Sequence, residues 1–148
     1  MGKNPEKRKK QNIEQLLREH KRIEITPNGF SMYPLFYSGR DRAIIEAAEL
    51  RKLRRGDVVL YRRREEGILV LHRIWKIKKE GVYLVGDHQT EIEGPLEKRQ
   101  IKGKMVAFKR KGKQHSTRNL WYILYSRLWL RLRPFRHKIE LVVHRLKF

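Results

Sequence analysis

The stretch "GILVLHRIWKIKKEGVYLVGD", residues 67–87, has the pattern of two β-strands joined by a short turn. Val, Ile, Leu and Tyr dominate both halves, and the charged, glycine-containing segment 79–81 separates them. We therefore predict a hairpin with strands at 68–79 and 82–87. In an alternating strand, one face carries Val70, His72 and Ile74 and the other carries Leu71, Arg73 and Trp75.

Further short strands are predicted on both sides of this hairpin. The segments 41–48, 56–64 and 100–112 have strand composition, and "REEG" at 64–67 is expected to be a turn. Ile13, Leu16 and Leu17 recur at helical spacing, which predicts a short amphipathic helix over 10–22. The fold class predicted is mainly β: a compact antiparallel scaffold with a short N-terminal helix and a basic amphipathic C-terminal helix.

The C-terminal part changes period. Residues 109–117, "KRKGKQHST", have the composition of a linker, and a helical stripe follows, with Pro134 expected to break or kink it. The stripe consists of Trp121, Tyr125, Leu128, Leu132 and Phe135, and a second consists of Ile139, Val142, Val143 and Leu146. We expect three parts: a basic N-terminal helix or tail (1–24), a β domain (25–112) and a basic, aromatic helical tail (113–148).

Charge is concentrated at the C-terminal end. The formal net charge is +21, and residues 109–148 carry 12 basic residues and 1 acidic residue, a net +11. Such a segment favours polyanions, and large aromatic residues suit a bilayer interface better than a phosphate track. We therefore expect 118–148 to bind an anionic membrane surface, with nucleic acid as the less favoured partner. The stretch 120–130 is too short to span a bilayer, which needs about 20 residues.

Composition excludes several kinds of chemistry. The chain has no cysteine, which rules out disulfides, thiolate metal sites and cysteine nucleophiles. The polar N-terminus does not have the composition of a signal peptide, and no apolar run reaches bilayer-spanning length. His and carboxylate residues nowhere show metal-ligand spacing, so neither a metal nor another cofactor is expected.

Three residues are candidates for catalysis. Ser31 lies in "NGFSMYP" (28–34), and a serine becomes a nucleophile only beside a base. His72 shares its predicted face with apolar residues, and burial would keep it neutral, as a general base requires. Asp87, near the level of His72 in the hairpin, could orient the imidazole, with Asp57 and Asp41 as weaker alternatives. Taken singly, these residues could equally be a turn serine, a half-buried structural histidine and a strand-end aspartate.

Four ordered segments carry a family resemblance: "GFSMYPLFYSGRD", "LRRGDVVLYRR", "VLHRI" and "YLVGDHQ". In this order they resemble the boxes of the S24/S26 serine peptidases, which include type I signal peptidases and LexA-like self-cleaving repressors. The resemblance covers about residues 25–110. It implies that Ser31 is the nucleophile and that His72 stands where many members have a lysine base, as in the family's Ser-His branch. Asp87 matches the acid of the last box.

The resemblance implies a serine endopeptidase that cleaves leader or signal sequences. Together with the basic tail, it places the protein on the cytoplasmic side of the cell membrane, peripherally bound, or in the cytoplasm. Two features depart from the family: Arg40 is inserted in "GRD", and the N-terminal transmembrane anchor of membrane signal peptidases is not expected here. An inactive peptide-binding β module, and a basic protein that binds nucleic acid or membrane surfaces, remain open alternatives.

Overall fold

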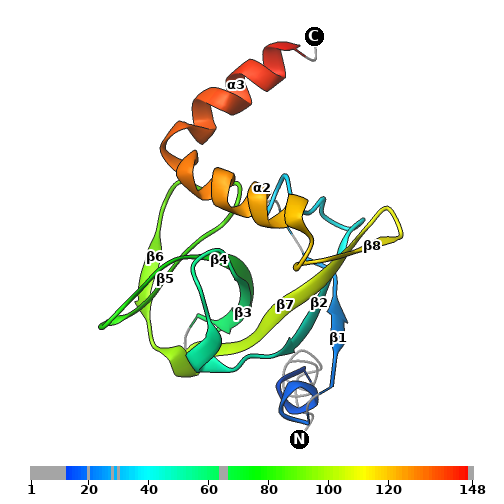
Figure 1. The fold of residues 1–148 in the computed structure, drawn as a ribbon, viewed down its shortest axis with the longest axis vertical. Helices are drawn as coiled ribbons and strands as arrows, with labels where there is room; N and C mark the ends of the chain where they lie inside the picture. Colours follow the sequence, from blue (N-terminus) through cyan, green and yellow to red (C-terminus); the bar gives the residue numbers. More distant parts are fainter. Residues whose placement is uncertain (1–12, 20, 28, 30, 64–66, 147–148) are drawn as a thin grey trace, which may run out of the picture.

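The computed structural model describes residues 13–19, 21–27, 29, 31–63 and 67–146. One antiparallel sheet of eight strands makes up most of it (Figure 1). The strands are β1 (Ile23–Ile25), β2 (Arg42–Ala47), β3 (Val58–Arg62), β4 (Leu69–Lys78), β5 (Gly81–Val85), β6 (Glu93–Leu96), β7 (Ile101–Arg110) and β8 (Lys113–Ser116). The helices are η1 (Leu50–Lys52), η2 (Lys98–Gln100), α2 (Leu120–Arg131), η3 (Arg133–Phe135) and α3 (Arg136–Leu146), and residues 13–18 are also helical.

The predicted mainly β fold is confirmed. The strand order is β1-β2-β7-β3-β4-β5-β6, with β8 pairing β7. The predicted hairpin is formed by β4 and β5, in which Lys78 lies opposite Gly81 and Arg73 lies opposite Val85. A register shift between Ile74 and Lys76 interrupts the alternation on β4, so the simple face assignment holds only up to residue 74. The predicted turn at 64–67 lies largely outside the described residues, as do 1–12.

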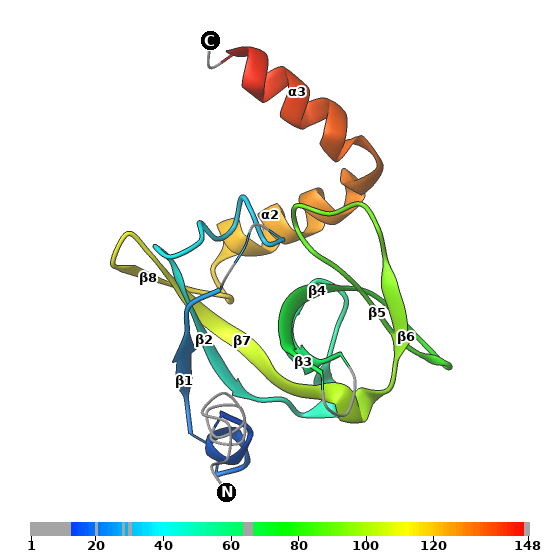
Figure 2. The same cartoon turned by 180° about the vertical axis from the view of Figure 1, so that it is seen from behind.

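The sheet curls strongly, and α2 lies across one end of it, whereas α3 extends away from the sheet (Figures 1 and 2). Apolar side chains form two hydrophobic core clusters on the curled sheet. One joins the Ser31 loop, through Met32, Leu35 and Phe36, to β2, β7 and the N-terminal helix. The other lies between β3, β4, β5 and β7 and includes Val59, Tyr61 and Ile74.

The prediction of a linker at 109–117 is wrong. Residues 113–116 form β8, which pairs with β7 from Ala107 to Arg110, so the boundary expected after residue 112 falls inside a hairpin. Its turn contains Lys111 and Gly112, both with positive φ (51° and 78°). Polar composition suggested a linker, but an edge strand exposed to solvent has the same composition because one partner strand suffices to order it.

The expected interruption at Pro134 is confirmed. Helix α2 ends at Arg131, the 3-10 turn η3 contains Pro134, and α3 begins at Arg136. Asn119 begins α2 by accepting a hydrogen bond from the Trp121 N–H at 2.9 Å. None of the helices among the described residues is long and apolar enough to cross a membrane.

Candidate active site

Ser31 lies in a turn that apolar neighbours fasten to the core. Met32 and Phe36 are buried, and the Phe36 N–H donates to the Met32 carbonyl at 3.1 Å. The apolar residue after Ser31 is therefore an anchor that fixes the turn. Ser31 itself is only half-buried, so its hydroxyl group can be reached from outside the core.

A second loop, residues 86–89 after β5, holds the Ser31 turn from the other side. The His88 N–H donates to the Ser31 carbonyl at 2.8 Å. A Cβ at Gly86 would lie 2.5 Å from that same carbonyl oxygen, so no larger residue fits there without a shift of the backbone. Two loops from distant parts of the chain thus fix the position of Ser31. No described residue accepts a hydrogen bond from the Ser31 N–H, which leaves this donor available.

His72 is buried on β4 and is oriented by Tyr61. The two residues lie on adjacent antiparallel strands, where His72 pairs with Val59 and Tyr61 is two residues further along β3. The Tyr61 Oη lies 3.1 Å from His72 Nδ1. The same hydroxyl donates to Glu93 Oε2 on β6 at 2.6 Å, and Glu93 Oε2 is 4.0 Å from His72 Nδ1.

This chain of contacts selects one tautomer of the imidazole. Because the Tyr61 proton is directed to Glu93, the Tyr61 oxygen can only accept from the imidazole. His72 must then carry its proton on Nδ1, which leaves the Nε2 lone pair free to accept a proton. Glu93 is held in turn by Arg63, whose Nε donates to Oε1 at 2.8 Å.

Electrostatics keep this imidazole neutral. Burial lowers the pKa of His72 to about 4, against a smaller upward effect of Glu93. Burial acts to raise the pKa of Glu93, but the hydrogen bonds from Arg63 and Tyr61 outweigh it and lower that pKa. At neutral pH the arrangement is therefore an ionised Glu93, a hydrogen-bonded tyrosine and a neutral His72. A neutral imidazole with a free nitrogen is the form that acts as a general base.

Ser31 and His72 line one cavity of about 660 Å³. Its walls include apolar side chains of the segment after β1 and of the start of β4, together with Arg63 and Gln89. Within the described part of the chain, no hydrogen bond joins Ser31 to His72, and the Ser31 hydroxyl has no hydrogen-bond partner. The structure thus brings the predicted nucleophile and the predicted base to the same cavity without a hydrogen bond between them.

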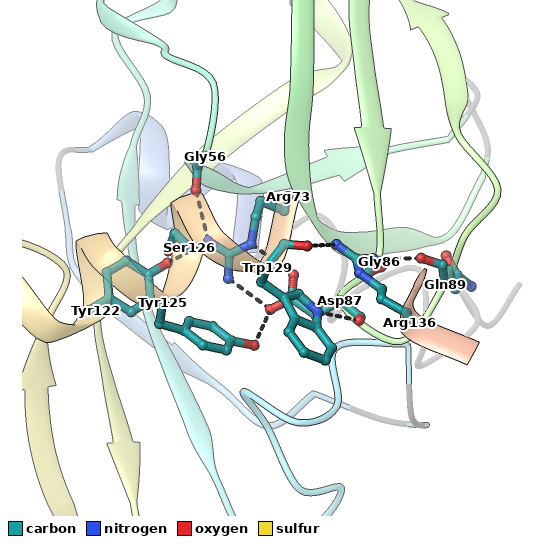
Figure 3. A network of polar contacts seen from close by, with 10 residues as sticks. All are labelled: Gly56, Arg73, Gly86, Asp87, Gln89, Tyr122, Tyr125, Ser126, Trp129 and Arg136. Atoms are coloured by element: carbon teal, nitrogen blue, oxygen red, sulfur yellow. Dashed lines mark hydrogen bonds and ion pairs between the residues drawn. The ribbon is translucent and has the colours of Figure 1, made fainter. Parts of the chain in front are cut away.

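The predicted orienting acid lies elsewhere. Asp87 is fully buried and makes a two-pronged ion pair with Arg73, Nε to Oδ1 and Nη2 to Oδ2, both at 2.8 Å (Figure 3). Val85 lies opposite Arg73, so their side chains share a face, and Asp87, two residues on, returns to that face rather than to that of His72. No hydrogen bond between Asp87 and His72 occurs among the described residues, and the Nδ1 partner is Tyr61.

The weaker alternatives are also engaged away from His72. Both oxygens of Asp41 bond to Arg40, the residue inserted in "GRD", and Oδ2 also accepts from the Tyr37 N–H. Asp57 accepts from the Arg54 N–H at 2.8 Å and lies 3.4 Å from Lys104. These aspartates stabilise loops at strand ends.

The Arg73–Asp87 pair extends into a network that fixes α2 and the 86–89 loop (Figure 3). Burial acts against the charge of Arg73, but Asp87 outweighs it and holds the pKa of Arg73 above its ordinary value. On α2, Tyr125 donates to Asp87 Oδ2 at 2.9 Å and Ser126 accepts from Arg73 Nη1 at 2.7 Å. The Trp129 Nε1–H donates to the Asp87 carbonyl at 2.6 Å.

Arg136, at the start of α3, completes the support of this loop. Its Nη1 donates to the carbonyls of Gly86 and Gln89 at 2.9 and 2.6 Å. Burial lowers the pKa of Arg136, and its Nε is buried without a hydrogen-bond partner. The helical tail is therefore part of the support of the Ser31 turn, through the loop that contacts it.

Comparisons with known proteins add nothing to this geometry. No family model, no curated protein and no solved structure matches the chain. In the part of the chain that the structure describes, no group of three or more His, Asp or Glu residues could hold a metal ion.

Proposed function

We propose that the protein is a serine endopeptidase of the S24/S26 type, resembling type I signal peptidases, with Ser31 as nucleophile and His72 as general base. The observation that carries the proposal is the state of His72. Nδ1 of His72 faces a tyrosine oxygen that already donates to Glu93, burial lowers the pKa of the imidazole, and the ring lines the same cavity as Ser31, whose hydroxyl has no hydrogen-bond partner among the described residues.

In the proposed reaction, Ser31 Oγ attacks the scissile carbonyl while its proton passes to His72 Nε2. The backbone N–H of Ser31 is the expected donor to the oxyanion. Collapse of the tetrahedral intermediate breaks the C–N bond, and His72 gives the proton to the leaving amine. A water molecule, deprotonated by His72, then hydrolyses the acyl-enzyme. Hydrogen bonds between catalytic groups often tighten only when substrate is bound, so the open cavity is compatible with this sequence of steps.

Tyr61 and Glu93 take the positioning role that the resemblance assigns to Asp87. The imidazolium that forms during attack would have Nδ1–H bonded to Tyr61, with the carboxylate of Glu93 at 4.0 Å from Nδ1. That negative charge stabilises the imidazolium as it forms. In this scheme Asp87 holds the loop that contacts Ser31, and its charge adds an upward effect on the pKa of His72 that is smaller than that of Glu93.

The free edge of β4 offers a place for an extended peptide. β5 pairs only with residues 73–78 of β4, so among the described strands residues 69–71 have β3 as their one neighbour. This edge begins directly beside His72, and its apolar side chains line the cavity. A peptide added here as a strand would have backbone hydrogen bonds and shallow apolar pockets. We propose as substrates the leader or signal sequences of exported peptides, at the cytoplasmic face of the cell membrane.

The test is cleavage of a synthetic leader peptide by the purified full chain, followed by mass spectrometry. Ser31→Ala and His72→Ala should each lower kcat/KM by roughly 10⁴- to 10⁶-fold. Ser116→Ala and His115→Ala, on β8, are matched controls and should cleave normally. Equal cleavage by wild type and both site variants would refute the peptidase. Tight binding of the peptide without cleavage by wild type would indicate the inactive β module instead.

A further inference from the structure

The outward side of α2 is strongly apolar. The residues on it recur at intervals of one, three and four, one face of the helix. They are Leu120, Trp121, Leu124 and Leu128, which are 69%, 81%, 51% and 58% exposed. We call these four residues the outer face of α2. Contiguous apolar exposure of this kind marks an interaction surface.

The opposite side of the same helix is already used by the fold. Four of its side chains contact Arg73 or Phe108 on the sheet or Asp87 in the 86–89 loop: Tyr122, Tyr125, Ser126 and Trp129. The polar network of Figure 3 therefore fixes α2, and the outer face is left to solvent. The outer face can lose its apolar side chains without breaking the described contacts between α2 and the sheet.

Basic residues surround the outer face. Arg118, Arg127 and Arg131 are exposed, and none of the three forms an ion pair with another described residue. Arg127 lies three positions after Leu124 and Arg131 three positions after Leu128, so both lie beside the apolar stripe, and Arg118 precedes the helix. The whole segment 109–148 carries a net charge of +11. The partner must therefore combine an apolar region with negative charge.

We propose that the outer face of α2 docks on the surface of an anionic phospholipid bilayer. Leu120, Trp121, Leu124 and Leu128 would enter the headgroup region, and the three arginines would pair with phosphates. The 12 residues of α2 span about 18 Å, shorter than the roughly 30 Å of bilayer hydrocarbon, so the helix would lie in the interface.

The structure favours lipid over nucleic acid. Single-stranded nucleic acid stacks its bases on successive aromatic rings. Helix α2 has four aromatic residues, and three of them, Tyr122, Tyr125 and Trp129, point to the sheet. Trp121 is the one aromatic residue of α2 on the outer face. The other three members are leucines, which offer nothing to a base but insert readily among acyl chains.

Flotation of the full-length protein with lipid vesicles tests the proposal. Wild type should float with phosphatidylcholine vesicles that contain phosphatidylglycerol, and much less with phosphatidylcholine alone. Leu120→Ser/Leu124→Ser/Leu128→Ser should lower the partition coefficient by about 100-fold or more. Arg127→Gln/Arg131→Gln should lower it by about 30-fold. Arg51→Gln/Arg99→Gln, an equal loss of charge on exposed residues of η1 and η2, should lower it only slightly, and circular dichroism should show all variants folded.

Ser31→Ala should float like wild type, so this test is independent of peptidase activity. Unchanged flotation of the triple serine variant, or equal losses in the two arginine pairs, would overturn the proposal. If the protein does not float, two other results would also overturn the proposal. One is that wild type, but not the triple variant, binds a single-stranded oligonucleotide, and the other is that wild type, but not the triple variant, self-associates. The first would identify the face as a nucleic-acid site and the second as a contact between copies of the chain.

Discussion

His72 and Arg73 are neighbours on β4, yet they belong to two different polar networks. His72 faces Tyr61 and Glu93, and one of its ring nitrogens has no hydrogen-bond partner among the described residues. Arg73 faces Asp87 and α2, with both carboxylate oxygens, a backbone carbonyl and two hydroxyl groups around its guanidinium. The first network has an unused acceptor that opens to a cavity, whereas the second is closed. A general base must have an unused acceptor, which the His72 network provides. The closed Arg73 network instead holds the surrounding loops in position.

The largest effect, on the free energy of unfolding, should come from removing Arg73 from the closed network. Arg73→Met leaves the carboxylate of Asp87 buried without its ionic partner, so we expect a loss of about 3–5 kcal/mol in the free energy of unfolding. Urea denaturation measures it. The double variant Arg73→Met/Asp87→Leu removes both charges and should recover most of this loss. A single variant as stable as wild type would mean that the pair is not a structural element.

Next in size is the effect of breaking the positioning chain at the site. Tyr61→Phe removes the acceptor of the Nδ1 proton, and we expect kcat/KM to fall by about 100-fold, or about 2.7 kcal/mol in the barrier. Glu93→Gln should lower activity as well and should shift the acid limb of the pH profile of kcat/KM to lower pH, because the upward influence of Glu93 on the pKa of His72 is lost.

Tyr83→Phe is the matched control for Tyr61→Phe. Tyr83 also donates to a glutamate, Glu80, at 2.9 Å, but this pair is exposed and lies at the β4–β5 turn. Its removal should leave kcat/KM unchanged. Equal activity of Tyr61→Phe and Tyr83→Phe would contradict a positioning role for Tyr61.

The neutral state of His72 should also make stability depend on pH. Its pKa is about 4 when folded and about 6.5 when unfolded, so between these values the unfolded chain binds more protons. The contribution is fully present above pH 6.5 and is lost as the pH falls towards 4, by about 2 kcal/mol at pH 5. Unfolding of wild type and His72→Leu at pH 7.5 and pH 5 measures it, since the variant lacks this component. An equal pH dependence in both proteins would contradict a lowered pKa.

The smallest effect expected concerns Tyr125, the tyrosine of the closed network. Tyr125→Phe removes one hydrogen bond from a carboxylate that keeps its ionic partner, at a cost of about 1.5 kcal/mol in unfolding free energy. Activity on a leader peptide should stay unchanged. Comparison with Tyr61→Phe sharpens the distinction between the networks, because each variant removes one hydroxyl that donates to a carboxylate. A larger loss of activity in Tyr125→Phe would reverse the roles proposed for them.

Alternation and composition predicted β2, β3, β4, β5 and β7, because the core-facing side chains of these strands had to be apolar, but they did not predict β1 or β6. The same reasoning missed β8, whose residues are polar because it is an exposed edge strand. It also placed Tyr125 on one face with Trp121 and Leu128, although these two are exposed and Tyr125 donates to Asp87 beneath α2. Helical periodicity identifies a face but does not tell which side of an amphipathic helix is buried when both sides carry aromatic residues.

At the site, Ser31 and His72 could be proposed from the sequence, and Asp87 was given a role that its position does not support. The side of the sheet on which Asp87 lies depends on the register between β4 and β5. The bulge in β4 and the hairpin turn set this register, and the sequence predicts it only approximately. Tyr61 could have been found, since a hairpin of 56–64 with 68–79 puts it diagonally across from His72 on one face. Glu93 gave no such signal, because it comes from β6, a strand separated from β3 by two others in the sheet.

The proposed reaction requires an imidazole that is neutral and has Nε2 free, and nitrogen NMR of the His72 ring tests this directly. In the folded protein at pH 7 we predict a proton on Nδ1, none on Nε2, and titration of the ring with a pKa of about 4. A ring protonated on Nε2 at pH 7, or one that titrates near the ordinary histidine value of about 6.5, would contradict His72 as the base for Ser31.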